Sequence, residues 1–204
     1  MNYLAHLHLG GQRPPQLLGS LYGDFVKGPL AGRFSDELAD AIQLHRSIDA
    51  FTDSHPLVKD AIARFPAERR RYAGIILDVF FDHCLARDWQ SYADVPLEIF
   101  TRKVYGVLAA EPELPGTLAL IAPRMAAQDW LSSYRDFAVV EQVLAGISRR
   151  LSRPQGLAGA MQELQALYQP LSADFAEFYP VLQNFSQDAQ AAQAALAGRA
   201  TSVG

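Results

Sequence analysis

The side chains best suited to chemistry gather in the N-terminal part of the chain. All histidines of the sequence fall within its first 83 residues: His6, His8, His45, His55 and His83. The same region contains several aspartates: Asp24, Asp49, Asp53, Asp78 and Asp82. Imidazole and carboxylate groups together are typical ligands of divalent ions such as Mn²⁺, Fe²⁺, Mg²⁺ and Zn²⁺. The sequence therefore predicts a metal site in this region.

One candidate pair is His45 and Asp49, which are four residues apart in a helical pattern. Residues at this spacing share a helix face, so both side chains can reach one ion. A plainer interpretation is equally compatible with the pair alone. In that interpretation Asp49 bonds His45 or pairs with Arg46 and binds no metal.

A second pair, Asp78 and Asp82, shows the same spacing within the most apolar helical pattern of the chain. Two carboxylates on one face of a buried helix repel each other and are costly to desolvate, so they need a cation, a shared proton or arginine partners. A metal would meet that need, and so would a salt-bridge network with Arg46 or Arg87. His83 follows Asp82 directly, and neighbouring helical residues do not share a face.

Isolated candidates are Asp24, which follows Gly23, and Lys27, three residues further on. Asp24 is a possible ligand or general base, although a turn or cap is the commoner use of such a residue. His6 and His8 have an alternating, strand-like spacing. Each of them alone is more often a buried, hydrogen-bonded histidine than a ligand.

Positive charge concentrates before and at the start of the apolar helix. The basic residues there are Arg64, Arg69, Arg70 and Arg71. Such a cluster suits phosphate or an acidic protein, and the alternative is a solvated helix face with arginine–acid pairs.

Helical periodicity runs through nearly the whole chain, which predicts an all-α fold in a single domain, 1–204. The expected helices are Pro14 to Val26, Ser35 to Phe51, Pro66 to Trp89, Pro96 to Ala109, Pro115 to Ser133, Phe137 to Leu151, Leu157 to Tyr168 and Leu171 to Leu196. Pro123 and Pro180 are expected to kink or split their segments. The tail 187–204 is expected to continue the last helix and then fray.

Composition excludes several classes of protein. Of 204 residues, 50% are hydrophobic and 20% are charged, which is typical of a globular protein and argues against disorder. A net charge of −4 argues against general nucleic-acid binding. The sequence shows neither a signal peptide nor an apolar run long enough for a membrane span. The single cysteine, Cys84, suits a reducing compartment, so a cytoplasmic location is predicted.

Taken together, a series of short blocks closely resembles the bacterial acyl carrier protein phosphodiesterases. The blocks are Asn2–Leu9, Leu18–Phe25, Leu44–Asp49, Phe51–Pro56, Arg70–Gly74 and Leu77–His83. The resemblance implies removal of 4′-phosphopantetheine from holo-acyl carrier protein, which leaves the apo-protein with a free serine. It also implies a helical fold distantly similar to the HD-domain phosphohydrolases, with Mn²⁺ as the usual metal and Mg²⁺ or another divalent ion as an alternative.

The chain departs from ordinary HD proteins because it carries Asp82-His83 in place of a His-Asp doublet. The metal-competent residues inside the matching blocks form the predicted ligand set: His6, Asp24, His45, Asp49, Asp78, Asp82 and His83. Asp24 is expected to orient or deprotonate the attacking water, while Lys27, Arg46 or Arg71 binds phosphate oxygens. The cluster from Arg64 to Arg71 is expected to dock the acidic carrier protein.

Two other functions remain open at this point. One is an HD-like phosphohydrolase that acts on a nucleotide or another small phosphodiester. The other is a non-catalytic helical protein that binds an acidic partner, and it predicts neither a bound metal nor turnover.

Overall fold

The computed structural model describes residues 1–149, 151, 154–157 and 159–201. Every regular element in these ranges is a helix, which confirms the predicted all-α class. The α-helices are α1 (Tyr3–Leu9), α2 (Pro14–Phe25), α3 (Asp36–Ser54), α4 (Pro56–Ala63), α5 (Arg70–Arg87), α6 (Leu97–Ala110), α7 (Gly116–Ala127), α8 (Trp130–Ser133), α9 (Phe137–Ser148), α10 (Ala160–Ala166) and α11 (Tyr168–Thr201). Two 3₁₀ turns, Trp89–Ser91 and Pro154–Leu157, complete the described elements.

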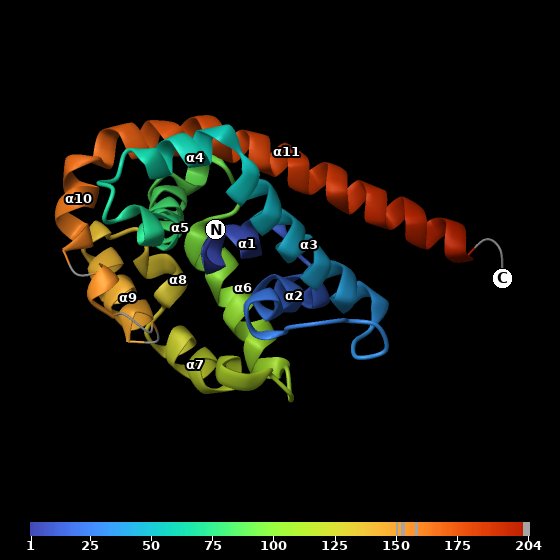
Figure 1. Ribbon diagram of the computed structural model, residues 1–204. Helices are drawn as coiled ribbons and strands as arrows, with labels where there is room; N and C mark the ends of the chain where they lie inside the picture. The colour runs from blue at the N-terminus through green and yellow to red at the C-terminus, as the bar shows by residue number, and fades with distance from the viewer. Residues whose placement is uncertain (150, 152–153, 158, 202–204) are drawn as a thin grey trace.

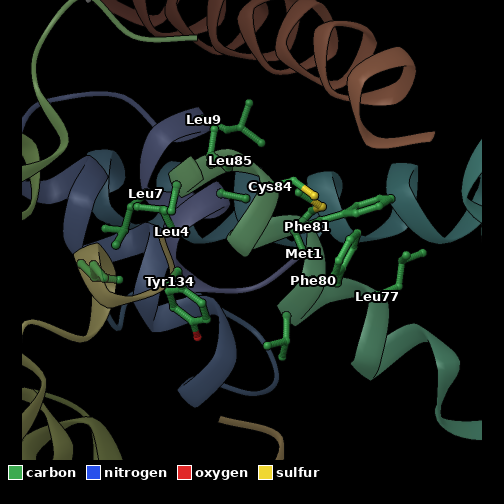
Figure 2. Packing of buried hydrophobic residues seen from close by; sticks show 14 of the residues in the cluster. Met1, Leu4, Leu7, Leu9, Leu77, Phe80, Phe81, Cys84, Leu85 and Tyr134 are labelled. Carbon is green, nitrogen blue, oxygen red and sulfur yellow. The ribbon is translucent and has the colours of Figure 1, made fainter. Parts of the chain in front are cut away.

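The core is built around α5, as its apolar pattern predicts. Phe80, Phe81 and Cys84 are almost fully buried there, α1 packs against the same helix, and its Leu4 and Leu7 belong to the same buried cluster (Figure 2). The N-terminal helix is therefore a central element, although it has only seven residues. Its position brings the first residues of the chain next to the helices that carry the other candidate ligands.

Helices α2 and α3 pack closely along their length. Ser35 caps α3, as predicted, because its side chain accepts a hydrogen bond from the backbone N–H of Leu38 at 3.4 Å. Gly19 on α2 faces Ala41 so tightly that a side chain at Gly19 would collide with it. The short distance between these two backbones sets where the side chains of α3 lie relative to α2.

The remaining helices surround this centre. Figure 1 shows α7, α8 and α9 following one another on the side of the molecule away from α3. It also shows α11 passing along α4 and α3 and continuing beyond them. No helix in the described part of the chain is both long enough and apolar enough to cross a membrane.

Several boundaries differ from the sequence prediction. The strand-like spacing of His6 and His8 was misleading, since both residues lie in α1. Helix α4 was not predicted. His55-Pro56 was expected only to end a helix, but His55 caps both helices and Pro56 begins α4.

The predicted helix from Pro115 to Ser133 is divided, but at Asp129, which has a φ of 45°, and not at Pro123. Pro123 lies inside α7, and Pro180 lies inside α11. The last helix continues through the alanine-rich tail to Thr201. The predicted fraying concerns in part residues 202–204, which are outside the described residues.

Candidate metal centre

Three side chains from two helices converge beside α2. His6 of α1 and His45 and Asp49 of α3 each offer a ligand atom, and these atoms lie within 4.8 Å of one another. Nε2 of His6 is 3.0 Å from Oδ1 of Asp49, and Nε2 of His45 is 3.3 Å from Oδ2. The predicted pair of His45 and Asp49 is thus joined by His6, which comes from a separate helix.

The orientation of His45 is fixed from the backbone of α2. Its Nδ1 donates a hydrogen bond to the carbonyl oxygen of Ser20 at 2.8 Å, which leaves Nε2 facing the carboxylates of Asp24 and Asp49. Gly23 makes room for the ring, because a β-carbon at this position would overlap it. A backbone carbonyl that orients the second nitrogen of a ligating histidine is a common feature of metal sites.

His6 is almost completely buried and its ring stacks on that of His45, with centroids 3.7 Å apart. Burial, only partly opposed by the Asp49 carboxylate, lowers the pKa of His6 to about 3, so the ring is neutral at ordinary pH. Neither ring nitrogen has a hydrogen-bond partner of suitable geometry among the described residues. A neutral, buried imidazole with a free lone pair is the form of histidine that binds metals.

These residues fit a divalent ion. Ligand atoms held about 2.1 Å from one ion lie roughly 3.0–3.4 Å from each other, depending on the angle between them. The two nitrogen–oxygen distances on Asp49 fall in that range. Burial raises the pKa of Asp49, but its contacts with His45 and His6 outweigh burial and hold the pKa below its ordinary value. The centre thus offers two imidazoles and one ionised carboxylate, a set suited to Mn²⁺, Fe²⁺ or Zn²⁺.

Asp24 lies at the edge of the centre, at the end of α2. Its Oδ1 is 3.9 Å from Nε2 of His45, and burial raises its pKa. Asp24, His45 and Asp49 line an open cavity of about 310 Å³ together with Lys27 and Arg46. The guanidinium of Arg46 donates a hydrogen bond to the carbonyl oxygen of Val26 at 3.0 Å, which holds it at this cavity. A negatively charged ligand entering the cavity would therefore meet the ligand cluster and two cations.

Asp78 approaches the centre from α5 but bonds a different group. Its Oδ1 is 2.9 Å from the α-amino nitrogen of Met1, which is also 3.7 Å from Oδ1 of Asp49. Burial lowers the pKa of this amino group, but Asp78 and Asp49 outweigh burial and raise the pKa to about 10. The amino group therefore stays charged between the two carboxylates and reduces their repulsion.

Comparison with known proteins identifies the family of this chain. The family model "Acyl carrier protein phosphodiesterase" matches residues 1–182. An acyl carrier protein phosphodiesterase of Yersinia enterocolitica is 37% identical over 93% of this chain and 100% of its own length. One of Salmonella agona is 37% identical over 96% of this chain and likewise 100% of its own length. The chain belongs to the acyl carrier protein phosphodiesterase family. No solved structure matches it significantly, so the likeness to HD domains stays a prediction.

In this member of the acyl carrier protein phosphodiesterase family, Asp24 and Asp78 lie at the border of the cluster, and two more of the predicted ligands lie outside it. Both carboxylate oxygens of Asp82 accept backbone hydrogen bonds, from Leu4 at 2.8 Å and from Ala5 at 3.0 Å. His83 points elsewhere, with Nδ1 2.8 Å from the carbonyl oxygen of Tyr134 and Nε2 2.8 Å from the hydroxyl of Tyr168. Asp82 thus caps α1, and His83 bridges α5 to more distant parts of the chain.

The predicted docking arginines divide into two groups. Arg64 makes two hydrogen bonds to Asp174 of α11, at 2.8 and 3.0 Å, and Arg69 bonds Glu163 of α10 at 2.8 Å. Their charges are therefore balanced within the molecule. Arg70 and Arg71 are exposed and form no ion pair among the described residues. The cluster is less positive than the sequence suggested.

Sequence reasoning missed the backbone features of this family member's centre. The carbonyl of Ser20 orients His45, and Gly23 admits the ring. The Gly19–Gly23 spacing was a usable signal, since glycines four residues apart on one helix face permit close helix packing. The carbonyl carries no sequence signal, because every residue has one.

Proposed function

We propose that this protein is a divalent-cation-dependent phosphodiesterase that removes 4′-phosphopantetheine from holo-acyl carrier protein. The observation that carries the proposal is the cluster of His6, His45 and Asp49, in a chain similar over its length to acyl carrier protein phosphodiesterases. Mn²⁺ is the proposed metal, because mixed imidazole and carboxylate sites suit it. A cytoplasmic setting is supported by the one cysteine, Cys84, which is buried and free.

The proposed reaction transfers the phosphoryl group from serine to water. The oxygen of water bonds to phosphorus, the bond from phosphorus to the serine oxygen breaks, and that oxygen takes up a proton. A divalent ion, when bound, neutralises charge on the diester and lowers the pKa of bound water. Asp24 is the proposed base, because its carboxylate lies beside His45 at the open side of the cluster. Lys27 and Arg46 bind the non-bridging phosphate oxygens and hold the diester in place.

The accessibility of the centre suits a protein substrate. The side chains of Asp24 and Asp49 are 44% and 43% exposed, while His6 and His45 behind them are buried. A phosphoserine-type diester on the surface of a carrier protein can therefore reach the ligands from the side of the open cavity. The carrier itself stays outside, against the residues that form the cavity mouth.

Intact-mass measurement of holo-acyl carrier protein tests the proposal. Incubation with this protein and Mn²⁺ should remove the mass of the phosphopantetheine arm, and a chelator should prevent the loss. Asp49→Asn should abolish the reaction. Asp40→Asn is the matched control, because Asp40 is an exposed aspartate of the same helix that is not part of the cluster.

The failing outcomes are informative. Unchanged carrier mass with folded, Mn²⁺-loaded protein would reject the carrier substrate, and turnover of a nucleotide or small phosphodiester would then identify the alternative hydrolase. Unchanged mass together with no Mn²⁺ binding would reject the enzyme and favour a helical binding protein.

A further inference from the structure

A second and larger cavity lies between the N-terminal segment and the helices α7, α8 and α9. Its volume is about 740 Å³. Most of its wall is apolar and includes Ile121, Trp130, Leu131, Val139, Val143 and Ile147. Hydrogen-bonding side chains are spaced around this wall, among them Asn2, Gln142, Arg124 and Arg149. A mostly apolar cavity of this size with a few polar groups is typical of a small-molecule site.

The cavity is connected to the metal centre through the N-terminal residues. Asn2 and Tyr3 form part of its wall, and the amino nitrogen of Met1 lies 3.7 Å from Asp49. Two successive Cα–Cα steps span at most about 7.6 Å, so the wall at Tyr3 is close to the ligand cluster. On the other side, the ring of Tyr3 stacks on Phe25, the residue that follows Asp24, with centroids 6.3 Å apart. The N-terminal segment thus runs from the ligand cluster to the wall of the second cavity.

A phosphodiester bound at the centre has two substituents, and these must extend from the phosphorus in different directions. One is the serine of a whole carrier protein, which needs the open side at Lys27 and Arg46. The other is a slender arm, which can follow the N-terminal segment towards α7–α9. We propose that this second cavity binds the pantetheine arm of the substrate, an inference that rests on the proposed function.

The chemistry of the arm matches the wall. Pantetheine has a dimethyl-substituted carbon and methylene units, which suit the apolar surface from α7 and α9. It also has two amide groups, whose carbonyl oxygens need donors and whose N–H groups need acceptors. Arg124 and Arg149 are donors without an ion pair among the described residues, and Gln142 offers both a donor and an acceptor.

Gly146 allows the cavity to be filled without disturbing the fold. It lies in α9 and lines the cavity, and a β-carbon there would meet only the Arg149 side chain, at 3.7 Å. Gly146→Phe should therefore occupy the space that the arm needs. Gly106→Phe is the matched control, because Gly106 lies in α6, does not line the cavity and has open space around its β-carbon position.

Binding of free pantetheine, measured by saturation-transfer NMR on the Mn²⁺-loaded protein, tests the cavity without turnover. The signal should be present for wild type and Gly106→Phe and lost for Gly146→Phe. The Michaelis constant for holo-acyl carrier protein should rise about tenfold or more in Gly146→Phe alone. Hydrolysis of bis(4-nitrophenyl) phosphate, a diester with no arm, should be the same in all three proteins.

The two hypotheses fail in different ways. Equal pantetheine signals and equal Michaelis constants in Gly146→Phe and wild type would overturn the cavity assignment while leaving the phosphodiesterase intact. Wild type that leaves holo-acyl carrier protein unchanged would overturn the proposed function. Pantetheine binding that Gly146→Phe abolishes would still support the cavity in that case.

Discussion

The carboxylates of Asp49 and Asp82 are held by different kinds of partner. Asp49 lies between two imidazole nitrogens, at 3.0 and 3.3 Å, and is partly exposed. Asp82 is fully buried, and both of its oxygens accept hydrogen bonds from backbone N–H groups at the start of α1. The first arrangement suits a metal, whereas the second anchors a helix through the positive end of its dipole.

Replacing each carboxylate should therefore affect a different property: stability for Asp82 and Mn²⁺ affinity for Asp49. Asp82→Ala leaves two buried N–H groups without acceptors, so the free energy of unfolding should fall by at least roughly 1–3 kcal/mol. Its Mn²⁺ affinity should change only slightly. Asp49→Ala should lose Mn²⁺ affinity by more than the roughly 10–100-fold typical of second-shell changes, and should remain folded. Urea denaturation and titration calorimetry measure the two quantities, and loss of Mn²⁺ binding in a folded Asp82→Ala protein would contradict this division.

His83 should make stability depend on pH. Burial lowers the pKa of His83 from 6.5, and the groups that face it are Arg87, Asp88, Asp136 and Tyr168. Below about pH 6.5 the unfolded chain takes up a proton that the folded protein resists, so the free energy of unfolding falls with decreasing pH. His83→Gln should lose less stability than wild type between about pH 7.5 and pH 5, measured by urea denaturation. An equal decrease in both proteins would show that His83 does not contribute.

At the scale of single elements, local pattern predicted the helices that carry their own signals. Ser35 and the two acids that follow it marked the start of α3 correctly, and proline marked the start of α2. Helix α1 gave no such signal, because its seven residues are too few for a period to show. It is stable through burial against α5 and through the distant Asp82, neither of which local sequence reveals.

The packing of α2 on α3 should be sensitive to a single methyl group. Gly23→Ala places a β-carbon against the His45 ring, so the ring or the helix must move. We expect a loss of roughly 1–3 kcal/mol in stability, together with weaker Mn²⁺ binding. Gly74→Ala is the control, because nothing lies within 4 Å of its β-carbon position in α5. That variant should gain up to about 1 kcal/mol and bind Mn²⁺ normally, and identical behaviour of the two variants would contradict the packing argument.

At the scale of the whole molecule, the candidate site depends on contacts that spacing cannot show. The i, i+4 rule predicted that His45 and Asp49 share a face, but only the fold brings His6 to them. The same rule grouped Asp78 with Asp82, yet these two residues bond different groups near the N-terminus. Likewise, Arg64 and Asp174 are 110 residues apart, so their pairing was not visible in the charge pattern.

Only the arginines that form no ion pair among the described residues are free to bind an acidic carrier protein. Arg71 and Asp78 are seven residues apart on α5, which places them on nearly the same face and about 10 Å apart along the axis. Arg71 therefore lies on the face of α5 that carries Asp78, and its charge is not balanced by an ion pair in the described chain. Arg64 is held by α11 instead.

Charge reversal should distinguish an arginine that attracts the carrier protein, Arg71, from one that stabilises the fold, Arg64. Arg71→Glu should slow association with holo-acyl carrier protein at low salt, and the difference from wild type should shrink as salt rises, because the steering of an acidic partner is screened. Arg64→Glu should lower thermal stability through repulsion of Asp174 and change the association rate less. Stopped-flow association at several salt concentrations measures the rates. A larger, salt-dependent rate loss in a folded Arg64→Glu protein would instead place the docking surface at the α4–α11 junction.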